Sequence, residues 1–240
     1  MQNSYLNISR TKDLDNPKER FIYRIFEFIP ALVSWGTLFL AVIFSWLAPV
    51  WVAVFIIVFD IFWLLRIFYL SFHQSASYRL MKENLKIDWL ERVKKLENWE
   101  KIHHLIILPM YKEGIEIVGS SIQSMLDANY PKEKMIIILA TEARAGNEAQ
   151  EVARLAKEEF GNKFFQFLVT AHPNDIPGEI AGKGSNVAWA AKEAKAVFDK
   201  LSMPYENIIA SNFDIDTRPY PQYFAILTWK YLTSEKSLRA

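Results

Sequence analysis

Two long apolar runs, separated by only two residues, constrain this chain more than any other feature. The first run, Phe28–Leu47, carries no charged residue, and the second, Val50–Leu70, carries two, Asp60 and Arg66. Each run has about 20 residues, the length at which a helix crosses a hydrocarbon layer of about 30 Å. Helices in soluble cores rarely lack a polar face over such a length. We therefore expect a two-helix transmembrane hairpin in which Pro49 breaks the helix at the turn.

Basic residues lie on both sides of the predicted hairpin, and none lies in its turn. They are Arg10, Lys12, Lys18, Arg20 and Arg24 before it, and Arg79, Lys82, Lys86, Arg92, Lys94 and Lys95 after it. Because basic residues favour the cytosolic side, we expect a multi-pass membrane protein with both termini and the globular domain in the cytoplasm. A carboxylate inside a membrane helix costs about 2.5–3.5 kcal/mol on insertion scales. Asp60 is therefore expected to face the partner helix, another subunit or a polar cavity, or to be protonated or close to the interface.

Composition narrows the class of protein further. The formal net charge is +1 and there is no cysteine, so the sequence predicts no nucleic-acid partner and excludes disulfides and thiolate metal sites.

The polar stretch 1–27 lacks the early apolar core of a secretory signal and is expected to be a cytosolic tail. After the hairpin at 28–70, residues 71–101 read as an amphipathic connector with apolar side chains at helical spacing. This connector lies either on the inner leaflet or against the next domain.

Residues 102–240 alternate between strand and helix patterns. Apolar runs predict strands at 102–108, 135–141, 164–170 and 206–213, and helical patterns lie at 116–129, 147–161 and 184–201. In the second helix, Asn147 is the expected N-cap and Gly161 the terminator. This alternation predicts an α/β fold with a parallel sheet and helices on both faces. Ligands of such open sheets bind beyond the carboxyl ends of the strands, so the polar segments at those ends form the candidate site.

The last predicted strand ends in two aspartates, Asp214 and Asp216. In an extended backbone, residues i and i+2 point to the same face, so both carboxylates are expected to aim at one point. Two such carboxylates repel each other unless a cation lies between them, which indicates Mg²⁺ or Mn²⁺. The alternative is that the pair arose by chance and that Asp216 caps a following helix.

The segment Gly182–Asn186 (GKGSN) opens a predicted helix. The two glycines allow backbone amides to approach an anion, and both Lys183 and the helix dipole favour negative charge there. The spacing is not that of a P-loop. The alternative is an ordinary loop in which Ser185 or Asn186 caps the helix.

Two further strand ends carry candidate ligand-binding side chains. The first strand leads into PMYKEG, in which Tyr111 is suited to stack on a base and Glu113 to bind a sugar hydroxyl or a ring N–H. The second strand leads to Glu142. For both glutamates the alternative is a first-turn helix residue that is satisfied by the helix dipole.

These segments together resemble the family 2 glycosyltransferases over about residues 102–233, with the hairpin as a common kind of N-terminal anchor. PMYKEG is similar to the family's P-x-Y-N-E segment, GKGSN to its Gly-Lys-Gly/Ala segment, and DID to its metal-binding D-x-D. The resemblance implies a Rossmann-like nucleotide-diphospho-sugar transferase sheet of the glycosyltransferase A type. It also implies a membrane-bound, metal-dependent, inverting enzyme that transfers a sugar from a nucleotide-diphospho-sugar, often a UDP-sugar, to a lipid-linked or polysaccharide acceptor.

The same resemblance implies a role for each matching residue. Pro109, Tyr111 and Glu113 match the P-x-Y-N-E segment, and Tyr111 and Glu113 would hold the base and ribose. Lys183 would lie near the nucleotide. The aspartates of the DID segment, Asp214 and Asp216, would hold the diphosphate through Mg²⁺ or Mn²⁺.

The chain also departs from the family pattern. Lys112 replaces the usual asparagine, and the usual aspartate after the second strand is absent, with Glu142 the nearest acid. The family's general base is expected beyond residue 240, so we expect a truncated form of a longer protein. Two alternatives remain open. One is a sugar nucleotidyltransferase, which usually has a glycine-rich, arginine-bearing loop that PMYKEG lacks; the other is a non-catalytic, membrane-anchored nucleotide-sugar-binding module.

Overall fold

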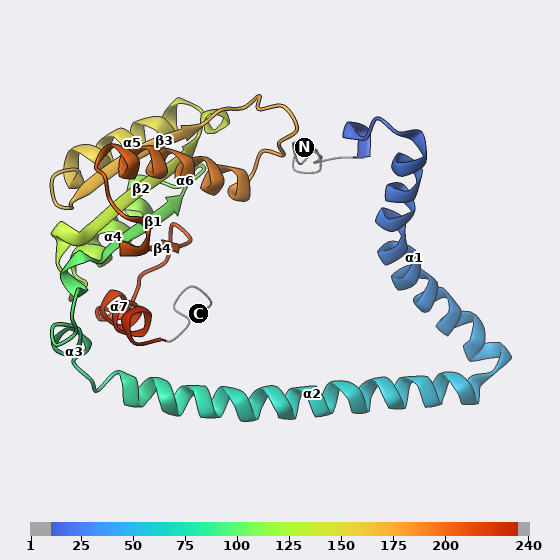
Figure 1. Cartoon of the computed structure of the whole chain (residues 1–240). Coiled ribbons are helices and arrows are strands. Elements are labelled where there is room, and N and C mark those ends of the chain that lie inside the picture. Colours follow the sequence, from blue (N-terminus) through green and yellow to red (C-terminus); the bar gives the residue numbers. More distant parts are fainter. Residues whose placement is uncertain (1–10, 235–240) are drawn as a thin grey trace. The chain divides into compact units, whose positions relative to one another are not determined.

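A computed structural model describes residues 11–234 of the chain. The chain divides into two compact units, Met1–Ile87 and Asp88–Ala240. The first unit holds two long helices and the second is an α/β unit (Figure 1). Short 3-10 helices occur at Thr11–Asp13, Trp99–Lys101, Lys132–Lys134, Ala143–Ala145 and Tyr205–Asn207.

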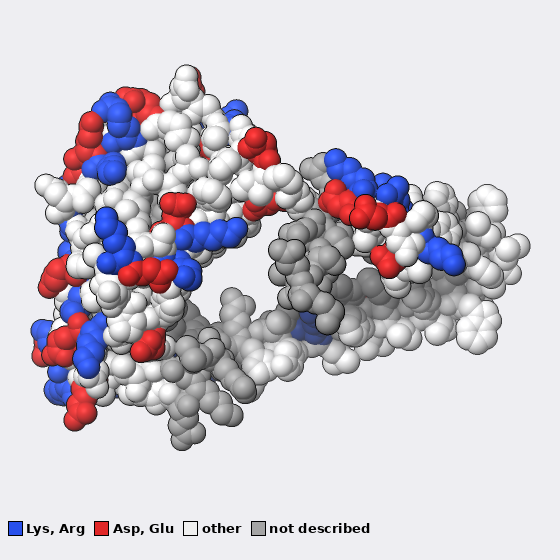
Figure 2. All heavy atoms as spheres, turned by 45° about the horizontal axis from the view of Figure 1, so that its top comes forward, with Lys and Arg blue, Asp and Glu red and all other residues white. Residues whose placement is uncertain are grey.

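The first unit consists of α1 (Pro17–Leu47) and α2 (Pro49–Asn84). Asn16 caps α1 by accepting a hydrogen bond from the Lys18 N–H, and a proline begins each helix, where its missing N–H has no intrahelical partner to lose. The predicted break at Pro49 is therefore confirmed. Both helices are long and apolar enough to cross a membrane. The charged side chains of α1 gather in its first turns (Figure 2), and none follows Glu27 in that helix.

The two helices show no close packing along their length. No residue of α1 or α2 is buried, although the helices adjoin near the break through Leu40 and Phe44 on one side and Trp51 and Phe55 on the other. A tight hairpin would bury the facing side chains, so that arrangement stays a prediction. The predicted tail at 1–27 partly lies outside the described residues, and its last part forms the first turns of α1.

The expected connector at 71–101 is not one amphipathic helix. No proline or glycine interrupts the chain after Leu70, so α2 continues to Asn84. The chain then begins the short helix α3 (Trp89–Val93), which Asp88 caps by accepting from the Glu91 N–H. Trp89 is buried and its ring meets that of Trp229 at 5.2 Å, so this part of the connector belongs to the α/β unit.

The α/β unit is built on four parallel strands in the order β3-β2-β1-β4 (Figure 1). The strands are β1 (His103–Pro109), β2 (Met135–Glu142), β3 (Gln166–His172) and β4 (Ile208–Asn212). All are within about two residues of the predicted apolar runs, and the expectation of a parallel α/β sheet is confirmed. Because both faces of β1 and β2 are covered, these strands are apolar without alternation over Leu105–Pro109 and Met135–Ala140.

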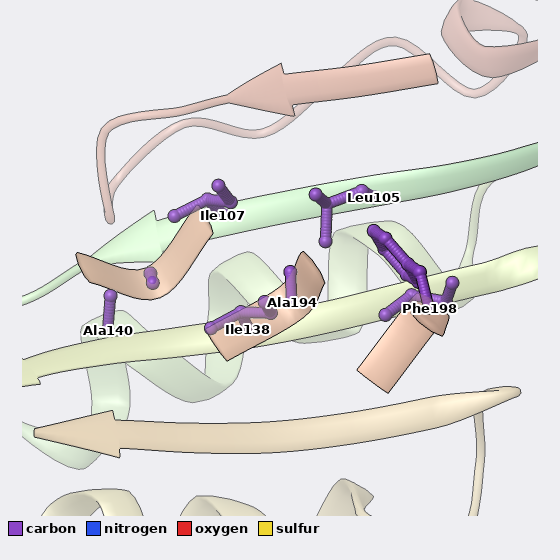
Figure 3. Packing of buried hydrophobic residues seen from close by; sticks show 8 residues of the cluster. Leu105, Ile107, Ile138, Ala140, Ala194 and Phe198 are labelled. Atoms are coloured by element: carbon purple, nitrogen blue, oxygen red, sulfur yellow. The ribbon is translucent and has the colours of Figure 1, made fainter. Parts of the chain in front are cut away.

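One face of the sheet packs against α6 (Lys183–Lys200). Three residues that recur every four positions along α6 face the sheet. They meet Leu105 and Ile107 of β1 and the neighbouring Ile136 and Ile138 of β2. The three residues of α6 are Ala190, Ala194 and Phe198; Figure 3 shows Ala194 and Phe198 over the sheet. The small alanines let the helix approach the sheet closely, and Phe198 fills the space at the far end.

The other face is covered by α4 (Ile115–Leu126), α5 (Asn147–Phe160) and α7 (Tyr223–Thr233). Ile106 and Ile137 alternate with the residues under α6 and are fully buried on this side. The start of α5 differs from expectation, because Gly146 is its N-cap with φ 89°, and Asn147 is the first helical residue. Gly161 does end α5, and an added Cβ there would clash with the Lys157 carbonyl oxygen.

A buried polar group holds α7 beside β1. The Nε2 of His104 lies 2.8 Å from the Thr228 Oγ1, and the hydroxyl of Tyr130 lies 3.1 Å from the same Thr228 oxygen. Burial lowers the pKa of His104 to about 3 and raises the pKa of Tyr130 to about 12. The packing of α7 in turn sets the path of the chain between β4 and α7.

Candidate functional site

The strand order places a ligand-binding position at the carboxyl ends of β1 and β4. The chain moves from β1 to β2 on one side and returns to β4 on the other, so the crossovers diverge and leave a crevice at this switch point. A cavity of about 370 Å³ lies there, within the usual range for small-molecule sites. Its lining residues are Pro109, Met110, Tyr111, Glu113, Ile117, Glu142, Lys183, Asn186, Asp214, Ile215 and Asp216.

The seven residues predicted to contact a ligand or metal all line this one pocket. They are Pro109, Tyr111, Glu113, Glu142, Lys183, Asp214 and Asp216. They come from four segments of the chain: the ends of β1 and β2, the start of α6, and the turn after β4. Their roles as ligand contacts remain predictions, but the arrangement brings the segments together as the parallel sheet required.

The segment after β1 forms a sharp turn around Glu113. The Met110 N–H still donates to the Ala140 carbonyl at 2.9 Å, which extends the pairing of β1 with β2. The Tyr111 N–H then donates to the Glu113 carboxylate at 2.6 Å. The alternative interpretation of Glu113 as a first-turn residue of α4 is wrong, because Glu113 precedes the N-cap Gly114. Its carboxylate shapes the turn and lines the pocket.

Tyr111 is surrounded by positive charge. The Arg144 guanidinium lies 5.1 Å from the centre of its ring and the Lys112 ammonium 5.4 Å, distances at which the ring face attracts a cation. Arg144 also donates to the carboxylate of Glu142, which is 4% exposed. Glu142 is therefore a buried, paired acid that positions Arg144. No sequence pattern indicates this role for Arg144, because it depends on a contact between the loops after β1 and β2.

The start of α6 is open toward the pocket. Gly182 is extended with φ 170°, a conformation that any residue adopts, and an added Cβ at Gly182 or Gly184 would meet nothing within 4 Å. The fold itself therefore does not require either glycine. Ser185 closes the turn, because its Oγ accepts from the Gly182 N–H at 3.0 Å.

Asn186 is a pocket residue that the sequence analysis treated only as a possible cap. It is 1% exposed, and its Nδ2 donates to the Ala140 carbonyl at 2.7 Å. Its Oδ1 has no hydrogen-bond partner among the described residues, which is costly for a buried acceptor. The signal was present in the sequence, because Asn186 is four residues before Ala190 and so lies on the buried stripe of α6.

Asp214 and Asp216 meet the pocket in a different way from that expected. β4 ends at Asn212, and the Thr217 N–H donates to the Asp214 carbonyl at 2.9 Å, so the two aspartates lie in a turn. The assumption of an extended backbone was wrong, because Ile215 between them is buried and anchors the turn. Both aspartates nevertheless line the pocket. Asp216 has no hydrogen bond or ion pair within the part of the chain that the structure describes.

Lys183 pairs with Asp214 across the pocket. Its Nζ contacts the Asp214 Oδ1, and the two side chains are 52% and 66% exposed. The turn that carries Asp214 is itself tied to α4, since the Ser121 Oγ donates to the Thr217 carbonyl at 2.9 Å. Residues 31 positions apart in the sequence are thus held in contact at the mouth of the pocket.

The acid content of the pocket fits a cation that is held jointly with a ligand. No group of three or more His, Cys, Asp or Glu suited to a metal occurs among residues 11–234, and the DID turn supplies two carboxylates. Mg²⁺ is commonly bound by one or two carboxylates together with substrate phosphates. The pocket carries four acidic residues and one basic residue, so a diphosphate entering it would need a compensating cation.

Comparison with known proteins adds no further assignment. The chain matches no protein-family model, no curated protein sequence and no solved structure.

Proposed function

We propose that this chain binds a nucleotide-diphospho-sugar, with a UDP-sugar favoured, in the pocket at the carboxyl ends of β1, β2 and β4. The proposal extends to a membrane-bound inverting glycosyltransferase that transfers the sugar to a lipid-linked or polysaccharide acceptor at the inner leaflet. One observation carries it: three separate segments bring an aromatic ring, an open helix N-terminus with its lysine, and two aspartates to a single cavity.

The two ends of the pocket suit the two halves of a nucleotide diphosphate. The start of α6 offers backbone N–H groups and the positive end of a helix of 18 residues, which favours phosphate oxygens. The end of β1 offers the Tyr111 ring and the Glu113 carboxylate for the base and ribose. The free Oδ1 of Asn186 lies buried in the same pocket, and a hydroxyl or N–H of the ligand would satisfy it.

Asp214 and Asp216 would hold the Mg²⁺ or Mn²⁺ ion, which when bound neutralises charge on the leaving diphosphate. The remaining residues position and shield the donor. Ile117 and Ile215 supply apolar lining, and the Glu142–Arg144 pair keeps a positive group beside Tyr111. The sugar would then be presented to an acceptor hydroxyl, whose proton must pass to a base.

A second candidate function is nucleotide-sugar binding without catalysis. Three of the four pocket carboxylates have hydrogen-bond or ion-pair partners: Glu113 with the Tyr111 N–H, Glu142 with Arg144, and Asp214 with Lys183. An acid engaged in this way must give up its partner before it can approach an acceptor hydroxyl. The two candidates are separated by incubating the protein with UDP-sugars and membrane lipid extract and measuring UDP release, which only the enzyme produces.

Substitution of Asp216 tests the shared binding function. Asp216 is exposed and makes no hydrogen bond or ion pair in the described chain, so Asp216→Ala is expected to change the free energy of unfolding by less than about 0.5 kcal/mol. It is expected to abolish the Mn²⁺-dependent part of UDP binding, measured by calorimetry with and without Mn²⁺. Glu193→Ala, which removes an exposed acid of α6 outside the pocket, is the matched control. Equal Mn²⁺-dependent UDP binding by the Asp216→Ala variant and the wild type would contradict the proposal.

A further inference from the structure

The contact between Lys183 and Asp214 lies where the proposed cation would bind. The Lys183 ammonium touches the Oδ1 of Asp214, so a lysine currently supplies the positive charge that the cation would supply. We propose, as an extension of the function above, that Lys183 couples the two ligands. It neutralises Asp214 in the free protein and passes to the diphosphate when cation and diphosphate bind together.

A cation alone is disfavoured by this arrangement. It must displace the Lys183 ammonium from Asp214, and the DID turn then offers it two carboxylates, because residues 11–234 hold no group of three or more metal-ligating side chains. The displaced ammonium remains next to a divalent cation without an anion of its own. Because both partners of the ion pair are more than half exposed, the pair is weak and its competition amounts to about two- to fivefold in the binding constant.

A diphosphate alone is disfavoured for the opposite reason. It would enter a pocket with four acidic residues, in which the one lining lysine is already paired with Asp214. If Lys183 turns to the diphosphate, Asp214 and Asp216 are left facing a further anion. When both ligands are present, the cation holds the aspartates and Lys183 holds the diphosphate, so every charge has a partner. Binding of each ligand therefore strengthens binding of the other.

The position of Lys183 makes this transfer geometrically simple. Lys183 is the first residue of α6, so its side chain starts at the helix end where free N–H groups favour an anion. Gly182 and Gly184 on either side carry no Cβ, and the space beside each is open. A flexible four-carbon stem allows the ammonium to leave Asp214 for a phosphate oxygen without movement of the backbone.

The test is a set of titrations on the full chain in detergent or nanodiscs. Mn²⁺ binding is followed by the loss of the EPR signal of free Mn²⁺, and UDP binding by calorimetry at several Mn²⁺ concentrations. For Lys183→Met we expect Mn²⁺ alone to bind about two- to fivefold more tightly, because its competitor is gone. UDP at saturating Mn²⁺ is expected to bind about tenfold more weakly, because a hydrogen bond to a charged group is lost.

The opposite signs of these two effects are the diagnostic result. Linkage is reciprocal, so the factor by which Mn²⁺ improves UDP binding equals the factor by which UDP improves Mn²⁺ binding. That factor is expected to fall in the Lys183→Met variant and to be retained in Lys183→Arg. Lys192→Met removes a positive charge from an exposed position on the same helix and is expected to leave both affinities unchanged. Circular dichroism checks folding, and Lys183→Gln replaces the methionine variant if that variant does not fold.

The outcomes separate this inference from the proposed function. If the wild type binds UDP with Mn²⁺ but Lys183→Met binds Mn²⁺ no more tightly, the coupling role of Lys183 is overturned and the proposed function stands. If the wild type binds no UDP in the presence of Mn²⁺, the proposed function fails and the coupling fails with it.

Discussion

Protonation of His104 is expected to make the α/β unit acid-sensitive. His104 is fully buried on β1, with its Nε2 2.8 Å from the Thr228 Oγ1 and its ring against Tyr130 and Phe224. Burial first, and the neighbouring His103 second, lower its pKa from 6.5 to about 3. The folded state therefore holds neutral imidazole, while the unfolded chain takes up a proton as the pH falls below 6.5.

The sign and size of the effect follow from this difference in pKa. A lowered folded-state pKa contributes stability that is complete above pH 6.5 and is lost as the pH falls from 6.5 toward 3. The slope in that window is about 1.4 kcal/mol per pH unit. Between pH 7.5 and pH 5 the free energy of unfolding is therefore expected to fall by about 2 kcal/mol from this one group.

The assay is urea unfolding of the full chain in detergent, followed by near-UV circular dichroism at a series of pH values. His104→Gln keeps a polar side chain beside Thr228 but cannot titrate. This variant is expected to have a lower free energy of unfolding at pH 7.5 than the wild type. Its free energy of unfolding is also expected to lack the decrease with falling pH that His104 causes. His103→Gln is the matched control, because His103 is the adjacent residue but only half-buried, and most of the slope is expected to remain. A slope that is the same in wild type and His104→Gln would refute the reasoning.

Two further substitutions test the core and the pocket. Phe198→Ala removes the largest side chain that α6 contributes to the cluster over Leu105 and Ile138. We therefore expect urea unfolding to show a loss of about 3–5 kcal/mol in the free energy of unfolding. A loss below about 1 kcal/mol would show that α6 is not packed as described. Gly184→Ala adds a methyl group that meets nothing within 4 Å in the protein. Because Gly184 lies in the first turn of α6, stability is expected to rise by less than the about 0.5–1 kcal/mol of a mid-helix position. UDP affinity is expected to fall, because the methyl group occupies the approach of the anion. Unchanged calorimetric UDP affinity in Gly184→Ala would count against an anion at the start of α6.

Local patterns in the sequence were sufficient for the four strands, for α4, α5 and α6, and for the class of fold. The apolar runs of β1 and β2 follow from burial on both faces of a parallel sheet, and that burial can be read without a structure. The same holds for the two long apolar helices and for the break at Pro49 between them. These features depend on residues close together in the chain, which is why periodicity alone predicts them.

Sequence patterns indicated which segments meet at the edge of the sheet but not the contacts within the site. β4 lies next to β1 rather than β3, and only that order brings Asp214 into contact with Lys183. The turn around Ile215, the contact of Arg144 with Tyr111 and the unsatisfied oxygen of Asn186 likewise depend on neighbours from distant segments. The connector shows the same limit, since its apolar stripe looked uniform but its end, α3, packs on α7 through the contact of Trp89 with Trp229. Periodicity reports which face of an element is buried, whereas the partner on that face is decided by long-range packing of the whole chain.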